Sequence, residues 1–269
     1  MLRKVLWTTL VVTVLVAGMS VSASAQEIYP PWVVFVLHPG QSTVFPRKFV
    51  TTPDIPPADV WWKATCADGI SATLAPVVYY SVPGNTEVNF VETISVDNST
   101  GPGDYYCAVE FYTGAYSTPN AGTWLGAQVL GIVVYPIEAP LDIRPTSCPN
   151  PLNVGEKGVL PVAILGAADF DATTVDVATV RLAGVAPLRW AMEDVATPYE
   201  PWNYKEDKMD CTTAGPDGYM DLTLKFNAAE VVAALGDIND GDVLVIQLTG
   251  DLLDGRAIAG QDVVVMIKK

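Results

Sequence analysis

Short runs of β-forming residues, each ended by Pro or Gly, are the feature that most limits how this chain can fold. Between residues 30 and 135 these runs include "WVVFVLHPG", "VVYYSVPGN", "TEVNFVETISVDN" and "DYYCAVEFYTG". The turn signals follow one another at spacings typical of sandwich strands, and almost no 3.6-residue periodicity is present. The pattern predicts an antiparallel β-sandwich for this half of the chain.

The second half is also dominated by β-type runs, such as "GVLPVAILG", "YMDLTLKF" and "QDVVVMIKK". One helix is expected among them, in "NAAEVVAALGD". Asn227 can cap it, Glu230 stands in the capping-box position, and Gly236 follows the last apolar residue as a stop. We therefore expect an all-β protein of two tandem antiparallel β-sandwich domains, the second with one short helix.

Residues 1–25 have the three parts of a secretory signal peptide: a basic start, an apolar run and a small-residue cleavage site that ends at Ala25. The alternative is a retained membrane anchor, but the apolar run falls short of the roughly 20 residues that span a bilayer. We expect cleavage after Ala25 and no membrane insertion afterwards. The mature chain is then secreted, extracellular or periplasmic.

The chain that remains is long enough for two ordinary domains. The segment "VYPIEAPLDIRP" contains Pro136, Pro140 and Pro145 and is typical of a linker that leads into a new strand. We place the domain boundary there, which gives an immunoglobulin-like sandwich over residues 26–139 and a second sandwich over residues 140–269.

The charge balance limits the partners. With 30 acidic and 15 basic residues, the formal net charge is −15. Such a surface repels phosphates, which argues against nucleic acid and anionic membrane surfaces as partners. It is compatible with solubility outside the cell and with divalent cations.

All four cysteines lie in the exported part: Cys66, Cys107, Cys148 and Cys211. An even number in an exported chain predicts two disulfides. Three pairings are open from the sequence, and Cys66–Cys107 with Cys148–Cys211 keeps each bridge within one domain. Zinc is the competing interpretation, but no C-x-x-C pair exists and His38 is the only histidine.

The stretch "GPGDYYCAVEF" resembles the strand that carries the second cysteine of the immunoglobulin family, where a Tyr stands two residues before the Cys. Tyr105 and Cys107 match that feature. Trp61 and Trp62 depart from it, because they precede Cys66 rather than follow it. The stretch is more similar to the sandwich modules of extracellular bacterial and archaeal proteins, and the resemblance implies a structural role for Tyr105.

Residues 140–269 resemble a module of secreted prokaryotic proteins, through "LDIRPTSCPNPLNVGEKGVLPVAILGAADFDATTVD", "TVRLAGVAPLRW" and "GPDGYMDLTLKF". This module is commonly C-terminal or repeated in surface proteins and has no assigned catalytic activity. The resemblance implies exposure outside the cell and modular construction rather than a reaction.

Similar modules carry alternating Asp and Asn residues before the "DL" strand, in a pattern that resembles a calcium loop. In this chain Asp217, Gly218 and Asp221 keep the pattern, while Thr213 and Gly215 occupy the earlier ligand positions. Glu193 and Asp194 are the candidates to complete a calcium site from another strand. The alternative is that "PDG" forms an ordinary turn with polar ends.

The loop "WAMEDVATPYEPWNYKEDKMDC" combines aromatic and acidic side chains. Tyr199, Trp202 and Tyr204 form the candidate ligand surface, because aromatic faces stack on sugar rings and carboxylates accept bonds from hydroxyls. The alternative is that Trp190 lies in the core and that the other aromatics pack the loop against a sheet. Asn98, in "NST", is a candidate glycosylation site.

The sequence lacks the motifs of nucleophilic, metal-dependent and nucleotide-using enzymes. We therefore expect a secreted non-catalytic protein with a structural or adhesive role at the cell surface or in the matrix, with calcium as the candidate stabilising ion. A second hypothesis is binding of an extracellular polysaccharide or surface protein through residues 190–211. A third is a glycoside hydrolase, which needs only two carboxylates.

Overall fold

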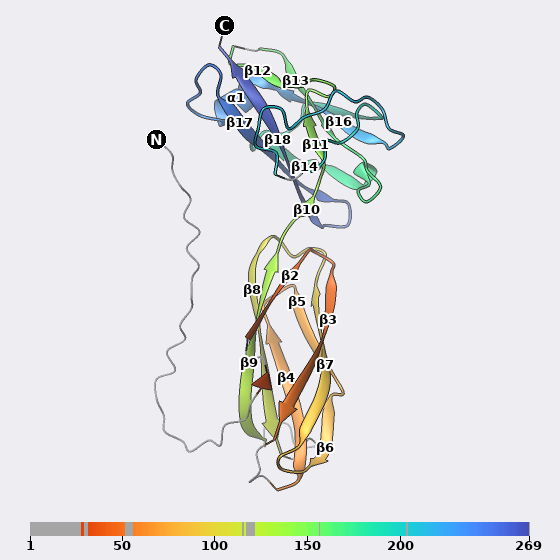
Figure 1. The fold of residues 1–269 in the computed structure, drawn as a ribbon, viewed down its shortest axis with the longest axis vertical. Helices are drawn as coiled ribbons and strands as arrows, with labels where there is room; N and C mark the ends of the chain where they lie inside the picture. Colours follow the sequence, from red (N-terminus) through yellow and green to blue (C-terminus); the bar gives the residue numbers. More distant parts are fainter. Residues whose placement is uncertain are drawn as a thin grey trace.

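The structure of the protein is a computed structural model that describes residues 28–29, 32–51, 56–114, 116, 122–155, 157–202 and 204–268. Two packed regions follow one another along the chain (Figure 1). We name them the N-terminal sandwich, which ends at Val134, and the C-terminal sandwich, which begins at Ile137. The predicted signal peptide, residues 1–25, lies outside the described residues, so cleavage after Ala25 stays a prediction.

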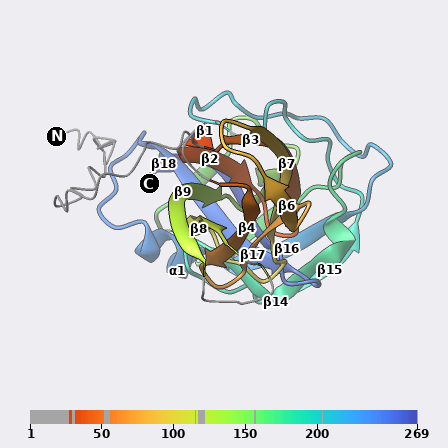
Figure 2. The ribbon, with the colours of Figure 1, turned by 90° about the horizontal axis from the view of Figure 1, so that it is seen from below.

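The described residues of the N-terminal sandwich form nine strands. They are β1 (Ile28–Tyr29), β2 (Trp32–Leu37), β3 (Ser42–Val50), β4 (Ala58–Cys66), β5 (Ile70–Ala75), β6 (Val78–Val82), β7 (Glu87–Val96), β8 (Gly103–Thr113) and β9 (Thr123–Val134). One sheet has the order β1-β3-β7-β5 and the other β2-β9-β8-β4-β6. Seen from below, β3 and β7 lie on one side and β9, β8 and β4 on the other (Figure 2).

Alternation of apolar and polar residues fills the space between these sheets. In β7 the residues Val88, Phe90, Ile94 and Val96 are buried while their neighbours face outward. The ring of Phe111, from the other sheet, lies 5.5 Å from that of Phe90. The core is therefore made by the inner faces of both sheets, as in other two-sheet folds.

The C-terminal sandwich has nine strands and one α-helix among the described residues. They are β10 (Ile137–Glu138), β11 (Leu141–Ile143), β12 (Pro151–Asn153), β13 (Val159–Ile164), β14 (Val175–Leu182), β15 (Arg189–Glu193), β16 (Asp221–Asn227), α1 (Ala228–Ala234), β17 (Val243–Leu252) and β18 (Ala257–Ile267). A short 3₁₀ turn, Ala172–Thr174, precedes β14.

These strands also form two sheets around one core. One has the order β10-β18-β17-β14, with β12 also paired to β18, and the other β11-β13-β16-β15. The predicted helix is confirmed: the Asn227 side chain accepts bonds from the backbone N–H groups of Ala229 and Glu230. Gly236 has a φ of +80°, which a glycine adopts without strain. Glu230 bonds the Asn227 side chain rather than its backbone, at 2.8 Å.

The all-β prediction is confirmed, but not every strand pair is antiparallel. β2 pairs in parallel with β9, and both β10 and β12 pair in parallel with β18. Parallel neighbours need a long connection between them, and here that connection is nearly a whole sandwich. Sequence alternation cannot show this, because it reports which face is buried and not which strand lies alongside.

Tyr105, two residues before Cys107, has the structural role that the immunoglobulin resemblance implies. The Tyr105 hydroxyl donates to the carbonyl oxygen of Gly101 at 2.9 Å, four residues upstream. Cys66 and Cys107 are directly opposite each other on β4 and β8, with their Cα atoms 4.0 Å apart, and form a disulfide. That bridge lies within one sheet, whereas the antibody bridge joins two sheets.

A buried ion pair lies inside the N-terminal sandwich. Nε of Arg47, on β3, donates to Oε2 of Glu92, on β7, at 3.2 Å, and neither side chain is exposed. The guanidinium also lies 4.9 Å from the ring of Phe45. Burial raises the pKa of Glu92, and the hydrogen bond and charge of Arg47 oppose that rise. The pair joins neighbouring strands within the core.

We expect Arg47→Ala to destabilise the N-terminal sandwich by about 3–5 kcal/mol, because it leaves the Glu92 carboxylate buried without its partner. The adjacent Lys48 supplies a control: its bond to Glu87 is half exposed, so Lys48→Ala should cost about 0.2–1 kcal/mol. Urea unfolding of the two variants checks the comparison. Equal losses would contradict the role given to the buried pair.

Candidate functional site

The acidic residues predicted to bind calcium lie around the loop between β15 and β16. The carboxylate of Asp194 accepts hydrogen bonds from the backbone N–H groups of Asp217, at 3.0 Å, and Gly218, at 2.9 Å. Asp217 in turn accepts from the N–H of Tyr219 at 3.0 Å. Asp194 and Asp217 are therefore brought together, as the calcium hypothesis requires, but they act as acceptors that fix a turn.

Asp221, at the start of β16, is fully buried and accepts three backbone hydrogen bonds. The donors are the N–H groups of Gly166 at 2.9 Å, Val195 at 2.7 Å and Ala196 at 3.2 Å. Burial raises the pKa of Asp221, and these three bonds oppose the rise. The side chain ties the end of β13 to the loop after β15.

The bonds seen here are those of the turn interpretation. Backbone N–H groups donate to the oxygens of Asp194 and Asp221, and calcium binding by these residues stays a prediction. Glu193 is exposed, lines a cavity with Thr223 and Lys225, and lies opposite Asp221 in the β15–β16 pair. Within the described ranges, no group of three or more His, Cys, Asp or Glu side chains could hold a metal ion.

We expect the thermal unfolding of the mature chain to be the same in EDTA and in millimolar calcium. Asp221→Ala should lower the stability by about 3 kcal/mol in both, because it leaves buried N–H groups unsatisfied. Asp217→Ala, at an exposed position, serves as the control with a small effect. A calcium-dependent rise in melting temperature that Asp221→Ala removes would restore the calcium site.

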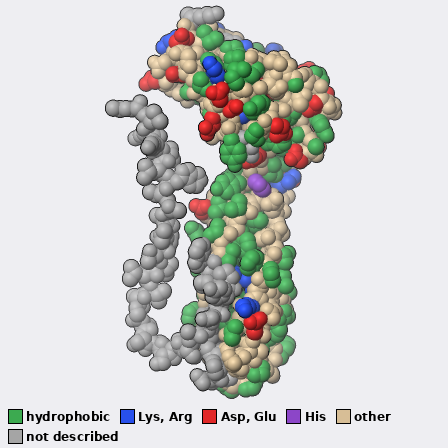
Figure 3. Space-filling model, in the orientation of Figure 1, with side chains coloured by type: hydrophobic (Ala, Val, Ile, Leu, Met, Phe, Trp, Pro, Cys, Tyr) green, Lys and Arg blue, Asp and Glu red, His purple; other side chains and the backbone are tan. Residues whose placement is uncertain are grey.

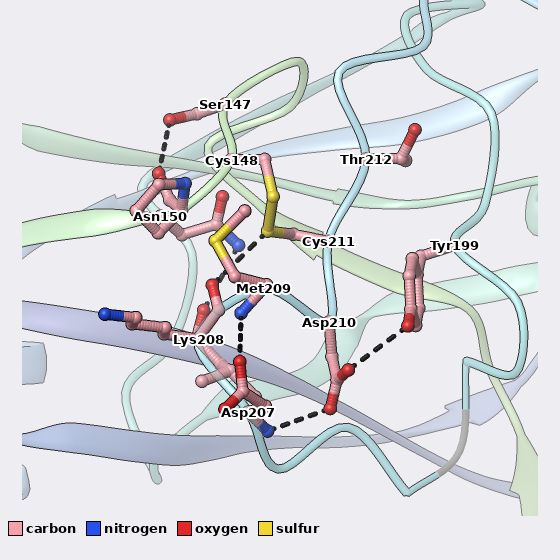
Figure 4. Close-up of a disulfide and its surroundings, with 12 residues drawn as sticks. Ser147, Cys148, Asn150, Tyr199, Asp207, Lys208, Met209, Asp210, Cys211 and Thr212 are labelled. Atoms are coloured by element: carbon pink, nitrogen blue, oxygen red, sulfur yellow. Dashed lines mark hydrogen bonds between the residues drawn. A yellow bond between two sulfur atoms is a disulfide. The ribbon is translucent and has the colours of Figure 1, made fainter.

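The second disulfide fixes the long loop that carries the candidate aromatic residues (Figure 4). Cys148 and Cys211 are bonded, with Cα atoms 5.4 Å apart. Beside the bridge, the carboxylate of Asp210 accepts from the backbone N–H groups of Glu206 and Asp207, both at 2.8 Å. Its other oxygen lies 3.1 Å from the hydroxyl of Tyr199, which donates to it.

Lys205 anchors the middle of this loop in the C-terminal sandwich. Its Nζ atom is buried and donates to the carbonyl oxygen of Leu141 at 2.7 Å and to Oδ1 of Asp262 at 3.0 Å. Oδ2 of Asp262 accepts from the N–H of Ile143 at 2.6 Å and from the Asn150 side chain at 3.0 Å. This anchor could not be predicted from the sequence, because "NYKEDKMD" has the composition of a solvated loop.

A second carboxyl group, Asp142, lies beside Asp262 and Lys205. It is 5% exposed, and burial together with the nearby charge of Asp262 raises its pKa to about 7. The positive charge of Lys205 opposes the rise. One lysine therefore faces two buried carboxyl groups, and near neutral pH Asp142 holds a proton for part of the time.

The C-terminal sandwich should lose stability as the pH rises from 4 to 8. The folded state keeps the Asp142 proton up to pH 7, whereas an unfolded Asp releases it near pH 3.9, so the loss can reach about 4 kcal/mol. Asp142→Asn should flatten this dependence, and the exposed Asp254→Asn should leave it unchanged. Urea unfolding at several pH values measures it, and a stability that increases over this range would contradict the assignment.

The three candidate ligand residues lie in different surroundings. Tyr199 is engaged with Asp210, and Lys205 lies 5.9 Å from its ring centre. Tyr204 is 76% exposed. Trp202 is partly buried and lines a cavity of about 400 Å³ at the junction of the two sandwiches.

The other residues around the cavity are both polar and apolar. The polar ones are His38, Gln41, Glu138, Asp169 and Arg256, and the apolar ones are Pro39, Ile137 and Phe170. Trp190 lies outside the core, with 56% of its surface exposed, which corrects the expectation that it packs inside. Asn98 is also exposed, in the turn between β7 and β8.

Two searches by sequence found no relative. No protein-family model matches the chain, and no curated protein matches it. The similarity of residues 140–269 to a module of secreted prokaryotic proteins therefore stays a prediction. Among the described residues, no helix is both long and apolar enough to cross a membrane.

Solved structures with similar β-architecture differ widely in sequence. The Escherichia coli chaperone DraB is 8% identical, with 88% of this chain and 98% of that chain covered and a TM-score of 0.31. The CBD12 structure from CALX1.2 is 10% identical over 83% and 78%, with a TM-score of 0.29. A family 123 glycoside hydrolase from Clostridium perfringens is 11% identical over 46% and 26%, with a TM-score of 0.28. These likenesses carry no statement about ligand or activity.

Proposed function

We propose that the mature chain is an exported, non-catalytic structural protein of the cell surface or the extracellular matrix. The proposal rests on the observation that the buried charged side chains form bonds within the fold. Arg47 and Glu92 bond each other, Asp221 bonds three backbone N–H groups, and Lys205 and Asp262 join four segments of the C-terminal sandwich. Each bond holds parts of the fold together.

Three further features support export. The disulfides Cys66–Cys107 and Cys148–Cys211 are of the kind that persists in oxidising compartments. Acidic side chains are spread over the C-terminal sandwich in the view of Figure 3, which suits a soluble surface outside the cell. The sequence of residues 1–25 supplies the export signal that the proposal needs.

Fractionation of the producing cells tests this proposal. We expect antibodies to find the protein in the envelope, the matrix or the medium, and mass spectrometry to find Gln26 as its first residue. A chain that keeps Met1 and stays inside the cell would overturn the proposal. A deletion strain with reduced cell cohesion would support the structural role directly.

Carbohydrate binding at the junction is the second candidate function. The observation in its favour is that Trp202 lines the cavity together with Glu138, Asp169 and Arg256. An indole face can stack on a sugar ring, and carboxylates and a guanidinium can bond its hydroxyl groups. Extracellular polysaccharide is the ligand class that this chemistry fits.

A glycan array followed by titration tests the second candidate. We expect Trp202→Ala to weaken the binding of any captured glycan at least about tenfold, the equivalent of about 1.4 kcal/mol. Trp190→Ala is the matched control, because Trp190 is exposed but does not line the cavity. Binding that survives Trp202→Ala, or an array without a captured glycan, would remove this candidate.

A further inference from the structure

In each sandwich an early strand, β2 or β10, runs in parallel beside the last strand, β9 or β18. In the N-terminal sandwich, β2 pairs with β9 from Trp32↔Val129 to Leu37↔Val134. The backbone N–H of Tyr135 extends this ladder with a bond to the Leu37 carbonyl oxygen at 3.1 Å. The chain thus enters the sandwich at one end of the ladder and leaves it at the other, where β9 leads toward β10 (Figure 1).

This arrangement decides how tension along the chain is carried. A pull on the N-terminus acts first on the short strand β1, which is held to β3 by two residue pairs, and then on the start of β2. A pull on the following sandwich acts on the end of β9. The two forces are opposed and parallel to the strands, so they load the evenly spaced hydrogen bonds of the ladder together. An antiparallel hairpin pulled from its two free ends would instead break one bond after another.

The C-terminal sandwich repeats the arrangement. β10 pairs in parallel with the start of β18, and β12 with its end, from Pro151↔Val265 to Asn153↔Ile267. Single bonds extend both pairings: the N–H of Ala139 donates to the Ala259 oxygen at 2.8 Å, and the N–H of Val154 donates to the Ile267 oxygen at 2.9 Å. Tension along the chain would therefore load the parallel pairs of β10 and β12 with β18 in shear as well.

The connection between the sandwiches is short and is fixed by hydrogen bonds from His38. Only Tyr135 and Pro136 separate β9 from β10. Nδ1 of His38 lies 3.0 Å and 3.1 Å from the carbonyl oxygens of these two residues, so this nitrogen carries the hydrogen that they accept. Little slack is therefore available between one ladder and the next.

We infer that this protein bears tension along its chain, with the β2–β9 ladder as the force-resisting clamp of the N-terminal sandwich. The inference deepens the proposed structural function and rests on it for its biological setting. The disulfides limit how far each sandwich can extend after its ladder breaks, because the chain between the bonded cysteines stays closed.

The test is single-molecule pulling of residues 26–269 from its two ends. Reduction of the disulfides shows which unfolding step belongs to which sandwich. Opening the 41-residue Cys66–Cys107 loop should lengthen the step of the N-terminal sandwich by roughly 140 Å, and opening the 63-residue Cys148–Cys211 loop should lengthen that of the C-terminal sandwich by roughly 220 Å. The comparison is a second attachment at the exposed Asn98, which lies at the end of the N-terminal sandwich where β9 leaves. Pulled from Asn98 and the C-terminus, the N-terminal sandwich should open at a clearly lower force.

Matched proline variants test the ladder itself. In a parallel pair every second residue directs its N–H and C=O to the neighbouring strand. Since Leu37 bonds across to Tyr135, Val33 also faces β9, whereas Val36 directs its backbone away from it at the sheet edge. We expect Val33→Pro to lower the unfolding force and Val36→Pro to leave it nearly unchanged.

Val33→Ala controls for the packing that Val33 makes with the core, because it keeps the N–H. The pulling-direction comparison needs no variant at β2 and so holds even if Val33→Pro does not fold. Equal forces in the two directions would overturn the inference, and so would equal forces for folded Val33→Pro and Val36→Pro. Both results are independent of where the cell places the protein, so they leave the proposed function itself standing.

Discussion

The carboxylate of Asp262 is the point on which the C-terminal sandwich depends. It lies on β18 and binds the backbone of Ile143, the side chain of Asn150 and the ammonium of Lys205. These partners come from the entering segment of the sandwich and from the long loop closed by Cys148–Cys211. A buried carboxylate must be satisfied by several donors or it destabilises the fold, so Asp262 fixes where these segments can lie.

The same strand is also the partner of β10, β12 and β17. β18 therefore combines the polar centre of the sandwich with the parallel pairings that place its ends in shear. β9 has the corresponding position in the N-terminal sandwich, between β2 and β8. In both regions the last strand lies inside its sheet and pairs in parallel with an early strand, β2 or β10. The structural role that we propose depends on this order of the strands.

Some features of the candidate site could be predicted from the sequence, and others could not. The alternation of inward and outward residues in β7 places Glu92 between Phe90 and Ile94 on the inner face. Its burial therefore follows from the two-residue period of a strand. The spacing of Asp217 and Asp221 is visible in the sequence. It could not reveal that the Asp221 oxygens accept bonds from backbone N–H groups of distant segments, while Asp217 accepts from the nearby N–H of Tyr219. Trp202 was noticed for its aromatic ring, while its cavity is lined from both sandwiches.

The sequence by itself determined the all-β class and the capped helix at Asn227, and it predicted two disulfides, because these depend on local periodicity, capping and composition. Only the tertiary structure decided which strands are neighbours, how Lys205 reaches Asp262, and that β2 lies parallel to β9. The physical reason is that local patterns fix the conformation and the buried face of each segment. Pairing between strands that are about a hundred residues apart depends instead on how the whole chain closes around its core.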